Sequence, residues 1–204
     1  MNLFDRPQHP VMIVIAGPSG VGKDTIAQKL IASRPDSFYF VVTATTRLAR
    51  VGEVDGEDYF FVTNDEFAHM IDTDELLEWA IVYNDFKGVP KQQIRDALAS
   101  DKDVILRVDV QGAATIRKLI PNAVFVFLAA ESEESLVQRL RDRRSETDSQ
   151  LSLRIATARK EMNRVNEFDY YVINRQDEQE RTVEVFRAII DSERHRLGRQ
   201  PIAI

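Results

Sequence analysis

A glycine-rich turn that carries one lysine lies near the start of the chain, at residues 17–23. Glycines without a Cβ let backbone N–H groups close around an anion, and a lysine beside them adds positive charge. The segment VMIVIAGPSGVGKDT matches the phosphate-binding spacing G-x-x-x-x-G-K-[ST] as far as Lys23, whereas Asp24 stands where a hydroxyl is expected. We therefore predict a nucleoside triphosphate site formed by Gly17, Pro18, Ser19, Gly20, Val21, Gly22, Lys23, Asp24 and Thr25.

The residues on either side of this turn favour a strand and a helix. Residues 12–16 form a short, unbroken apolar run, which is typical of a strand buried on both faces of a parallel sheet. Apolar residues then recur at helical spacing from Ile26 to Ile31, so the turn opens a helix whose N-terminus also attracts phosphate. The alternative is a glycine-rich connection with a solvated lysine, which these flanking elements disfavour.

Three side chains near this turn could act on a divalent cation. Asp109 lies in the apolar run of residues 104–110, near its carboxyl end, where open α/β sheets place their ligands. Asp24 brings a carboxylate to the phosphates, and Thr25 supplies a hydroxyl one residue late. Because Mg²⁺ accepts carboxylates and water, we predict that Asp24, Thr25 and Asp109 lie beside Mg²⁺, partly through water. For Asp109 the alternative is an N-cap of the following helix.

Arginines gather at two further places. Arg47 and Arg50 are three residues apart and could converge on one anion, although a solvated pair of loop charges is the alternative. The run from Arg139 to Arg144 is strongly basic, and Arg154 follows on a predicted helix. Such a run is usually a solvated face. Beside a triphosphate site it suggests a lid whose arginines offset charge that develops in the transition state.

One carboxylate, Glu78, lies inside the apolar run LLEWAIVY, residues 76–83. Burial of an unpaired carboxylate is costly, so Glu78 needs either a neighbouring arginine or a ligand that donates hydrogen bonds to it. Both interpretations stay open at the level of the sequence. Both interpretations require a partner for the Glu78 carboxylate from outside its own strand.

The composition limits the class of protein and its partners. The 204 residues are 44% hydrophobic and 29% charged, which is typical of a soluble globular domain. A net charge of −6 argues against a nucleic-acid polymer as partner, and the absence of cysteine excludes disulfides and thiolate metal sites. The longest apolar run, residues 123–130, is far below the roughly 20 residues of a membrane span. We expect a cytoplasmic protein without nucleic-acid or membrane partners.

Hydrophobic periodicity predicts a single α/β domain with two additions to its core. Strands are expected at residues 12–16, 38–43, 59–62, 76–83, 104–110, 123–129 and 170–174. Helices are expected after the glycine-rich turn and at residues 63–71, 90–101, 131–140 and 176–197, with a further helix start at 72–74. The predicted parts are a core of residues 11–43, 89–138 and 155–204, an inserted subdomain of residues 44–88 and a lid of residues 139–154.

Together these segments resemble the guanylate kinase family over residues 11–196. The segment TATTRLARVGEVDGEDYFFV is similar to the family's nucleoside monophosphate-binding segment, LLEWA to its guanine-reading strand and RVDVQG to its Mg²⁺-side strand. The turn GPSGVGKD and the dipeptide KG at Lys87 most resemble the organellar branch of the family. The resemblance implies an α/β P-loop NTPase fold with a parallel core sheet, an inserted GMP-binding subdomain and an arginine-bearing lid.

The resemblance also implies a reaction, in which the γ-phosphoryl of MgATP passes to GMP or dGMP in purine nucleotide metabolism. The glycine-rich turn would hold ATP, with Asn174 near its adenine. The implied GMP-binding residues are Thr43, Arg47, Arg50, Glu53, Tyr59, Glu78, Lys87 and Asp109. The implied catalytic residues are Lys23, Arg47, Arg139, Arg143 and Arg154.

Three positions depart from the common family pattern. Lys87 stands where a tyrosine usually binds phosphate, Val89 where a hydroxyl usually donates to guanine, and Arg107 where an aspartate is frequent. Two other functions match parts of the sequence. A ribose 1,5-bisphosphate phosphokinase also tolerates aspartate after the lysine, but its phosphosugar offers Glu78 no donors. A guanylate-kinase-like binding module typically loses the lysine or the lid arginines, which are present here.

Overall fold

The core of the molecule is a five-stranded sheet in which all neighbouring strands are parallel. A computed structural model describes residues 9–142 and 148–202. The strand order β2-β7-β1-β8-β9 places the first strand in the centre, where its residues are fully buried. The carboxyl ends of parallel strands lie along one edge of a sheet, where a site can form. The five strands are β1 Met12–Ala16, β2 Phe38–Val41, β7 Asp103–Arg107, β8 Val124–Ala130 and β9 Tyr170–Asn174.

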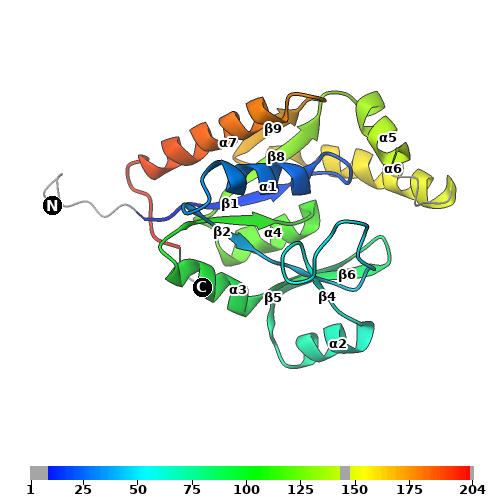
Figure 1. The fold of residues 1–204 in the computed structure, drawn as a ribbon, viewed down its shortest axis with the longest axis horizontal. Helices are drawn as coiled ribbons and strands as arrows, with labels where there is room; N and C mark the ends of the chain where they lie inside the picture. The colour runs from blue at the N-terminus through cyan, green and yellow to red at the C-terminus, as the bar shows by residue number, and fades with distance from the viewer. Residues whose placement is uncertain (1–8, 143–147, 203–204) are drawn as a thin grey trace, which may run out of the picture.

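Helices cover both faces of this sheet (Figure 1). Alternate residues of β1 point to opposite faces: Ile13 and Ile15 pack in the core cluster that contains residues of α1, α5, α6 and α7, whereas Met12 and Val14 pack with residues of α3 and α4. Among the described residues, no helix combines the length and apolarity needed to cross a bilayer. The helices are α1 Lys23–Ser33, α3 Lys91–Ala99, α4 Val110–Leu119, α5 Glu133–Arg141, α6 Asp148–Met162 and α7 Gln179–Arg194, with a short 3-10 helix at Val165–Glu167.

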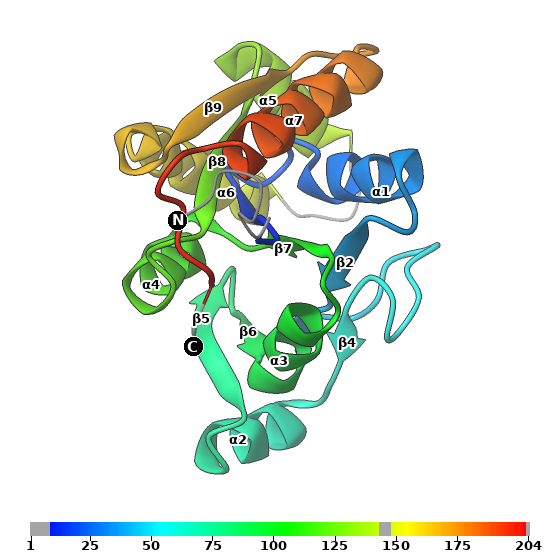
Figure 2. The ribbon, with the colours of Figure 1, turned by 90° about the vertical axis from the view of Figure 1, so that its left-hand side faces the viewer.

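A second, smaller sheet lies to one side of the core, as Figure 2 shows. Its strand order is β4-β3-β6-β5, and its own apolar cluster contains Ala44, Phe67 and Leu76, with Phe86 partly buried beside them. Trp79 lies outside this cluster, 46% exposed, with its ring centroid 6.0 Å from that of Phe86. The elements of this part are β3 Ala44–Thr45, β4 Phe60–Phe61, α2 Asn64–Asp72, β5 Leu76–Val82 and β6 Asp85–Pro90.

Strands β5 and β6 form an antiparallel hairpin with a two-residue turn. Tyr83 and Asn84 occupy the turn with φ values of 55° and 70°. Two consecutive positive φ values are typical of a type I′ turn, whose twist matches that of the strands it joins. The sequence predicted a strand at residues 76–83 and a helix from residue 90, with no strand between them, so β6 and the hairpin are findings of the structure.

Most predicted elements are present within a few residues of their expected ends, with two corrections. The expected helix start at residues 72–74 is wrong: Asp74 has a φ of 56°, and the N–H of Glu75 donates to the Met70 carbonyl, which ends α2 and directs the chain into β5. The strand expected over residues 104–110 ends at Arg107, and Val110 already belongs to α4.

A capping box lies at the start of α2, where the sequence predicted a helix over residues 63–71. The Thr63 hydroxyl accepts the Glu66 N–H at 3.2 Å, and the Glu66 carboxylate accepts the Thr63 N–H at 2.7 Å. These two bonds satisfy backbone donors that have no partner within the helix. Local sequence therefore fixes where α2 begins.

We predict that Thr63→Ala lowers the free energy of unfolding by about 1 kcal/mol, because it removes the cap acceptor. Thr115→Ala, at an exposed position inside α4, is the matched control and should be neutral or slightly stabilising, since alanine favours helix. Urea denaturation of both variants measures the difference. Equal stability of the two variants would show that the cap contributes nothing.

Candidate active site

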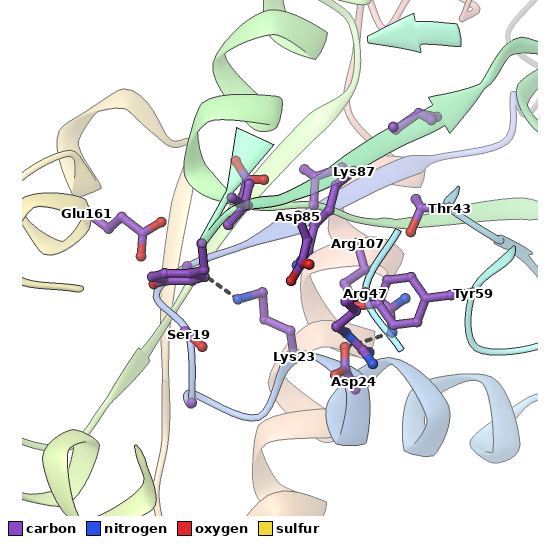
Figure 3. Close-up of a pocket in the computed structure, with 18 of the residues that line it drawn as sticks. Ser19, Lys23, Asp24, Thr43, Arg47, Tyr59, Asp85, Lys87, Arg107 and Glu161 are labelled. Carbon is purple, nitrogen blue, oxygen red and sulfur yellow. Dashed lines mark hydrogen bonds and ion pairs between the residues drawn. The ribbon is translucent and has the colours of Figure 1, made fainter. Parts of the chain in front are cut away.

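A cleft opens between the carboxyl ends of β1 and β7 and the second sheet, and Figure 3 shows the side chains that line it. It is strongly polar, with six cationic and five acidic side chains along its wall. The cations are Lys23, Arg47, Arg50, Lys87, Arg107 and Arg154, and the acids are Asp24, Glu78, Asp85, Asp109 and Glu161. The residues come from the core, from the second sheet and from α6, so three parts of the chain build one site.

The glycine-rich turn forms one wall as predicted. Gly22 is the N-cap of α1 with a φ of 90°, and a Cβ on Gly17 would lie 2.1 Å from the Leu128 carbonyl oxygen, so both positions require glycine. The Lys23 ammonium donates to the carbonyls of Gly17 at 2.6 Å and Pro18 at 2.9 Å. Burial lowers the pKa of Lys23 to about 8. Nearby phosphates would stabilise its charged form.

Not every residue predicted for the triphosphate site reaches the cleft. Gly17, Ser19, Gly20, Gly22, Lys23 and Asp24 line it. Pro18, Val21 and Thr25 do not. Val21 is fully buried in the core, and Thr25 is exposed, because one step along a helix turns a side chain by about 100°. The structure therefore leaves Asp24 and Asp109 as the lining residues from the predicted Mg²⁺ set.

Asn174 is held by contacts within the protein, and its predicted place near adenine stays a prediction. It is 3% exposed and does not line the cleft. Its amide nitrogen donates to the Val21 carbonyl at 2.8 Å, and its amide oxygen accepts from the Thr182 hydroxyl at 3.2 Å. Both ends of the amide are used within the protein, so Asn174 supports the glycine-rich turn from behind.

Arg47 and Arg50 both line the cleft, and Glu53 holds them in place. The Arg47 guanidinium makes two hydrogen bonds of 2.7 Å to the Glu53 carboxylate, which also accepts the Arg50 N–H at 2.7 Å. Despite partial burial, these bonds lower the pKa of Glu53. Glu53 is outside the cleft lining and its carboxylate orients Arg47, so contact of Glu53 with GMP stays a prediction.

Tyr59 lies between two guanidinium groups. Its ring centroid is 4.8 Å from Cζ of Arg47 and 4.1 Å from Cζ of Arg107, and the residue is only 7% exposed. Such stacking of cations on an aromatic face is attractive, more so when water is excluded. Figure 3 shows the three side chains grouped next to Asp24. Tyr59 and Arg47 therefore occupy the cleft as a preassembled pair.

Glu78 is buried in the wall of the cleft at 7% exposure. A register shift in β5 between Leu76 and Glu78, of the kind made by a β-bulge, accompanies its inward orientation. Its Oε2 atom has no hydrogen-bond partner among the described residues, and burial, with a smaller contribution from Asp109, raises the pKa of Glu78 to about 8. A buried acceptor of this kind requires a partner, which a ligand in the cleft can supply.

Asp109 lines the cleft and also caps α4. Its Oδ1 atom accepts the N–H groups of Gln111 at 2.8 Å and Gly112 at 2.9 Å. The N-cap that the sequence left as the alternative is therefore present. Capping uses one carboxylate oxygen, and a role of Asp109 toward a metal stays a prediction.

Of the predicted lid arginines, Arg154 on α6 reaches the cleft. It donates to the Ser19 hydroxyl at 3.3 Å, and its Cζ lies 4.6 Å from the Tyr83 ring centroid. Arg139 does not line the cleft: it donates to the Asn174 carbonyl at 2.9 Å, at the end of β9. Arg143 lies outside the described residues.

Comparison with known proteins gives a consistent result. Residues 9–193 match the family model "Guanylate kinase". The chain belongs to the guanylate kinase family. A rice protein named guanylate kinase 2, chloroplastic/mitochondrial is 51% identical over 199 residues, which cover 97% of this chain and 70% of that protein. The predicted resemblance to the organellar branch is thus confirmed.

Bacterial relatives and a solved structure agree with this assignment. The guanylate kinase of Caldanaerobacter subterraneus is 42% identical over 189 residues, covering 93% of this chain and 90% of that protein. The crystal structure of guanylate kinase from Anaplasma phagocytophilum is 29% identical, with a TM-score of 0.76, over 95% of this chain and 91% of that one. The chain is an ATP-dependent nucleoside monophosphate kinase with a P-loop fold.

Sequence reasoning missed three polar residues of this guanylate kinase site, Glu161, Tyr83 and Asp85. Glu161 lies on α6 at 7% exposure, with one oxygen unpartnered among the described residues, and burial raises its pKa. It stands in the polar stretch RKEMNR, where nothing local marks it as buried. Tyr83 reaches the cleft from the β5–β6 turn, and the residue Asn84 was the only signal for that turn.

Gly112 on α4 allows the close approach of Glu78. A Cβ at this position would lie 2.9 Å from Oε1 of Glu78, so Gly112→Ala must displace that carboxylate. We predict that the KM for GMP rises roughly tenfold, a loss of about 1.4 kcal/mol. The KM for ATP and the melting temperature should stay close to those of the unchanged protein, because alanine is favourable within a helix. Coupled assays and thermal denaturation measure these values, and an unaltered KM for GMP would contradict the prediction.

Proposed function

We propose that this guanylate kinase transfers the γ-phosphoryl group of MgATP to GMP, and likewise to dGMP, giving ADP and the nucleoside diphosphate in purine nucleotide metabolism. The observation that carries the proposal is Glu78, a buried carboxylate with an unpartnered oxygen in a cleft that also holds the P-loop lysine. Guanine presents N1–H and its amino group as adjacent donors, and one ionised carboxylate accepts both. Adenine lacks that pair of donors.

The choice of base follows from the cost of an unpaired charge. A ligand that leaves the Glu78 carboxylate without donors also leaves it desolvated, and sites of this kind reject the wrong ligand by factors on the order of 10⁴. Val89, fully buried beside Glu78 in the β5–β6 pairing, offers no side-chain donor to the guanine carbonyl. Recognition of the base therefore rests mainly on Glu78, with Thr43, which also lines the cleft, as a second predicted contact with GMP. Because GMP and dGMP share their base and their 5′-phosphate, both offer the two donors that the Glu78 carboxylate accepts.

The cations of the cleft are suited to two phosphate groups. Arg47, Arg50, Tyr59 and Lys87 belong to the second sheet and its loop, on the same side as Glu78, and would hold the phosphate of GMP. Lys23 and the glycine-rich turn would hold the phosphates of ATP. An ionised phosphate is already a nucleophile, so positioning and charge stabilisation can carry the reaction without a general base.

The acidic residues fit a magnesium ion that is bound mainly by phosphate and water. No group of three or more His, Asp or Glu residues within 9–142 and 148–202 could hold a metal on its own. Asp24 and Asp109 supply the hard carboxylate oxygens that Mg²⁺ prefers, and Mg²⁺ commonly needs only one or two of them beside phosphates. When bound, the ion would offset the charge of the transferred phosphoryl group. Lys23 and Arg154 add protein charge at the same place.

Glu78→Gln tests the choice of base. Glutamine keeps the size of the side chain but offers one acceptor and one amino donor, so the N1–H and amino pair of guanine is no longer matched. We expect the ratio of kcat/KM for GMP to that for AMP to fall by about two orders of magnitude or more. Glu57→Gln, at an exposed position in the loop that precedes β4, is the matched control and should leave the ratio unchanged. A ratio that is the same in both variants would refute the assignment of Glu78 to guanine.

The raised pKa of Glu78 predicts that GMP binding releases a proton. With a pKa of about 8, Glu78 is mostly protonated at pH 7 in the free enzyme, whereas two donors from guanine favour the ionised form in the complex. Affinity for GMP should therefore rise as the pH increases from 6 to about 8 and then level off. Calorimetry at pH 7 in buffers with different ionisation enthalpies should count close to one proton released. Glu78→Gln should abolish this release, and an equal count in both proteins would contradict the prediction.

A further inference from the structure

The most deeply buried cation of the cleft, Arg107 at the end of β7, contacts two other segments of the chain. Its side chain is 3% exposed, and its Nη1 donates to Oδ1 of Asp24 on α1 at 2.7 Å. Its Nη2 donates at 2.7 Å to the carbonyl oxygen of Asp58, in the loop that precedes β4. Its Cζ lies 4.1 Å from the centre of the Tyr59 ring. One guanidinium thus joins the P-loop helix, the end of β7 and the loop that carries Tyr59.

A second hydrogen bond at Asp58 joins the loop before β4 directly to α1. Gln28 donates from α1 to the Asp58 carboxylate at 2.7 Å, and that carboxylate also accepts the Val54 N–H at 2.9 Å. On its other side Tyr59 stacks on Arg47 at 4.8 Å. A continuous series of contacts therefore leads from the P-loop to the side chains assigned to the GMP phosphate. Figure 3 shows Asp24, Arg107, Tyr59 and Arg47 as one group of side chains in the cleft.

The carboxylate of Asp24 forms an ion pair with Arg107. A buried guanidinium needs a paired carboxylate, because removal of one member of a buried pair leaves an uncompensated charge. Burial lowers the pKa of Lys87, and the nearby charge of Arg107 adds to this effect, so Arg107 acts on another cation of the cleft. Asp24 and Arg107 were both departures from expected patterns in the sequence. The structure shows that they contact each other.

We propose that Asp24 and Arg107 act as one positioning unit, through which a residue of the ATP loop sets the place of the GMP-phosphate residues. Asp24 fixes the guanidinium of Arg107, and Arg107 holds the Asp58 carbonyl and the Tyr59 ring. The unit thereby orders Tyr59 and Arg47 before the nucleotide arrives. This inference rests on the proposed function of the cleft and extends it to two residues that need not touch GMP.

The direction in which Asp24→Asn changes the affinity for GMP distinguishes a positioning role from a purely electrostatic one. Asp24→Asn removes a negative charge near a phosphate site, which by itself should tighten the binding of an anion. If Asp24 instead keeps Arg107 and Tyr59 in place, the same change weakens the binding of GMP. Measurement without ATP and Mg²⁺ removes any role of Asp24 toward the metal. The Asp24 side chain is 37% exposed, so the substitution is compatible with folding.

The deciding experiment is calorimetric titration of GMP into the full chain and its variants, without ATP and Mg²⁺. We expect Asp24→Asn to weaken GMP binding roughly tenfold, which corresponds to about 1.4 kcal/mol. Arg107→Lys keeps the charge but loses the guanidinium fork, and should weaken binding to a similar degree. The double variant should bind no more than about twofold more weakly than Arg107→Lys alone, because two residues of one unit are not additive.

Asp191→Asn is the matched control. Asp191 pairs with Arg34 at the other end of α1 through bonds of 2.9 and 3.0 Å, far from the cleft lining. The Asp191→Asn substitution should lower the melting temperature and leave GMP binding unchanged. If the unaltered chain binds no GMP, the proposed function fails. If it binds GMP but Asp24→Asn binds equally or more tightly, or if the two single effects multiply in the double variant, the positioning unit is refuted while the kinase assignment stands.

Discussion

The site depends on keeping charged groups in place after they have lost contact with water. Lys23 and Lys87 are both buried enough that their pKa values are lowered, and Arg107 is almost fully enclosed. Each unpaired ion costs several kcal/mol to bury, so the cations are tolerated only because Asp24, Asp109 and other carboxylates face them. Bound phosphates would take over part of this compensation. The charges of the cleft therefore compensate one another, and removal of one of them raises the free energy of burying the others.

The parts of the fold that the sequence predicted best are those dictated by local chemistry. Strands β1 and β9 match their expected ranges at 12–16 and 170–174, because each is an apolar run with polar or glycine residues at its end. The start of α2, expected at residue 63, also lies close to its observed place, because the side chains of Thr63 and Glu66 fix it locally. Strand β6 was missed because residues 85–90 include an aspartate, a lysine, a glycine and a proline. Its pairing with β5 and β3, not its own composition, makes it a strand.

The site was predictable where a residue type contradicts its surroundings. Lys23 in a glycine turn and Glu78 in an apolar strand stand out in the sequence, and both line the cleft. Residues whose role depends on distant partners could not be assigned in this way. Asn174, for example, donates a hydrogen bond to the carbonyl of Val21, which is 153 positions away in the sequence. Glu161 faces the P-loop lysine only because α6 packs there.

The exposed indole of Trp79 gives the molecule a built-in optical reporter. It is the only tryptophan of the chain and follows directly after Glu78 in β5, with its side chain on the opposite surface of the strand. The emission of a half-exposed indole responds to the polarity and mobility around it. Its nearest described ring, Phe86, belongs to the same small sheet. Fluorescence excited at tryptophan wavelengths therefore originates solely from the small second sheet. Changes around this sheet can be followed without an attached dye.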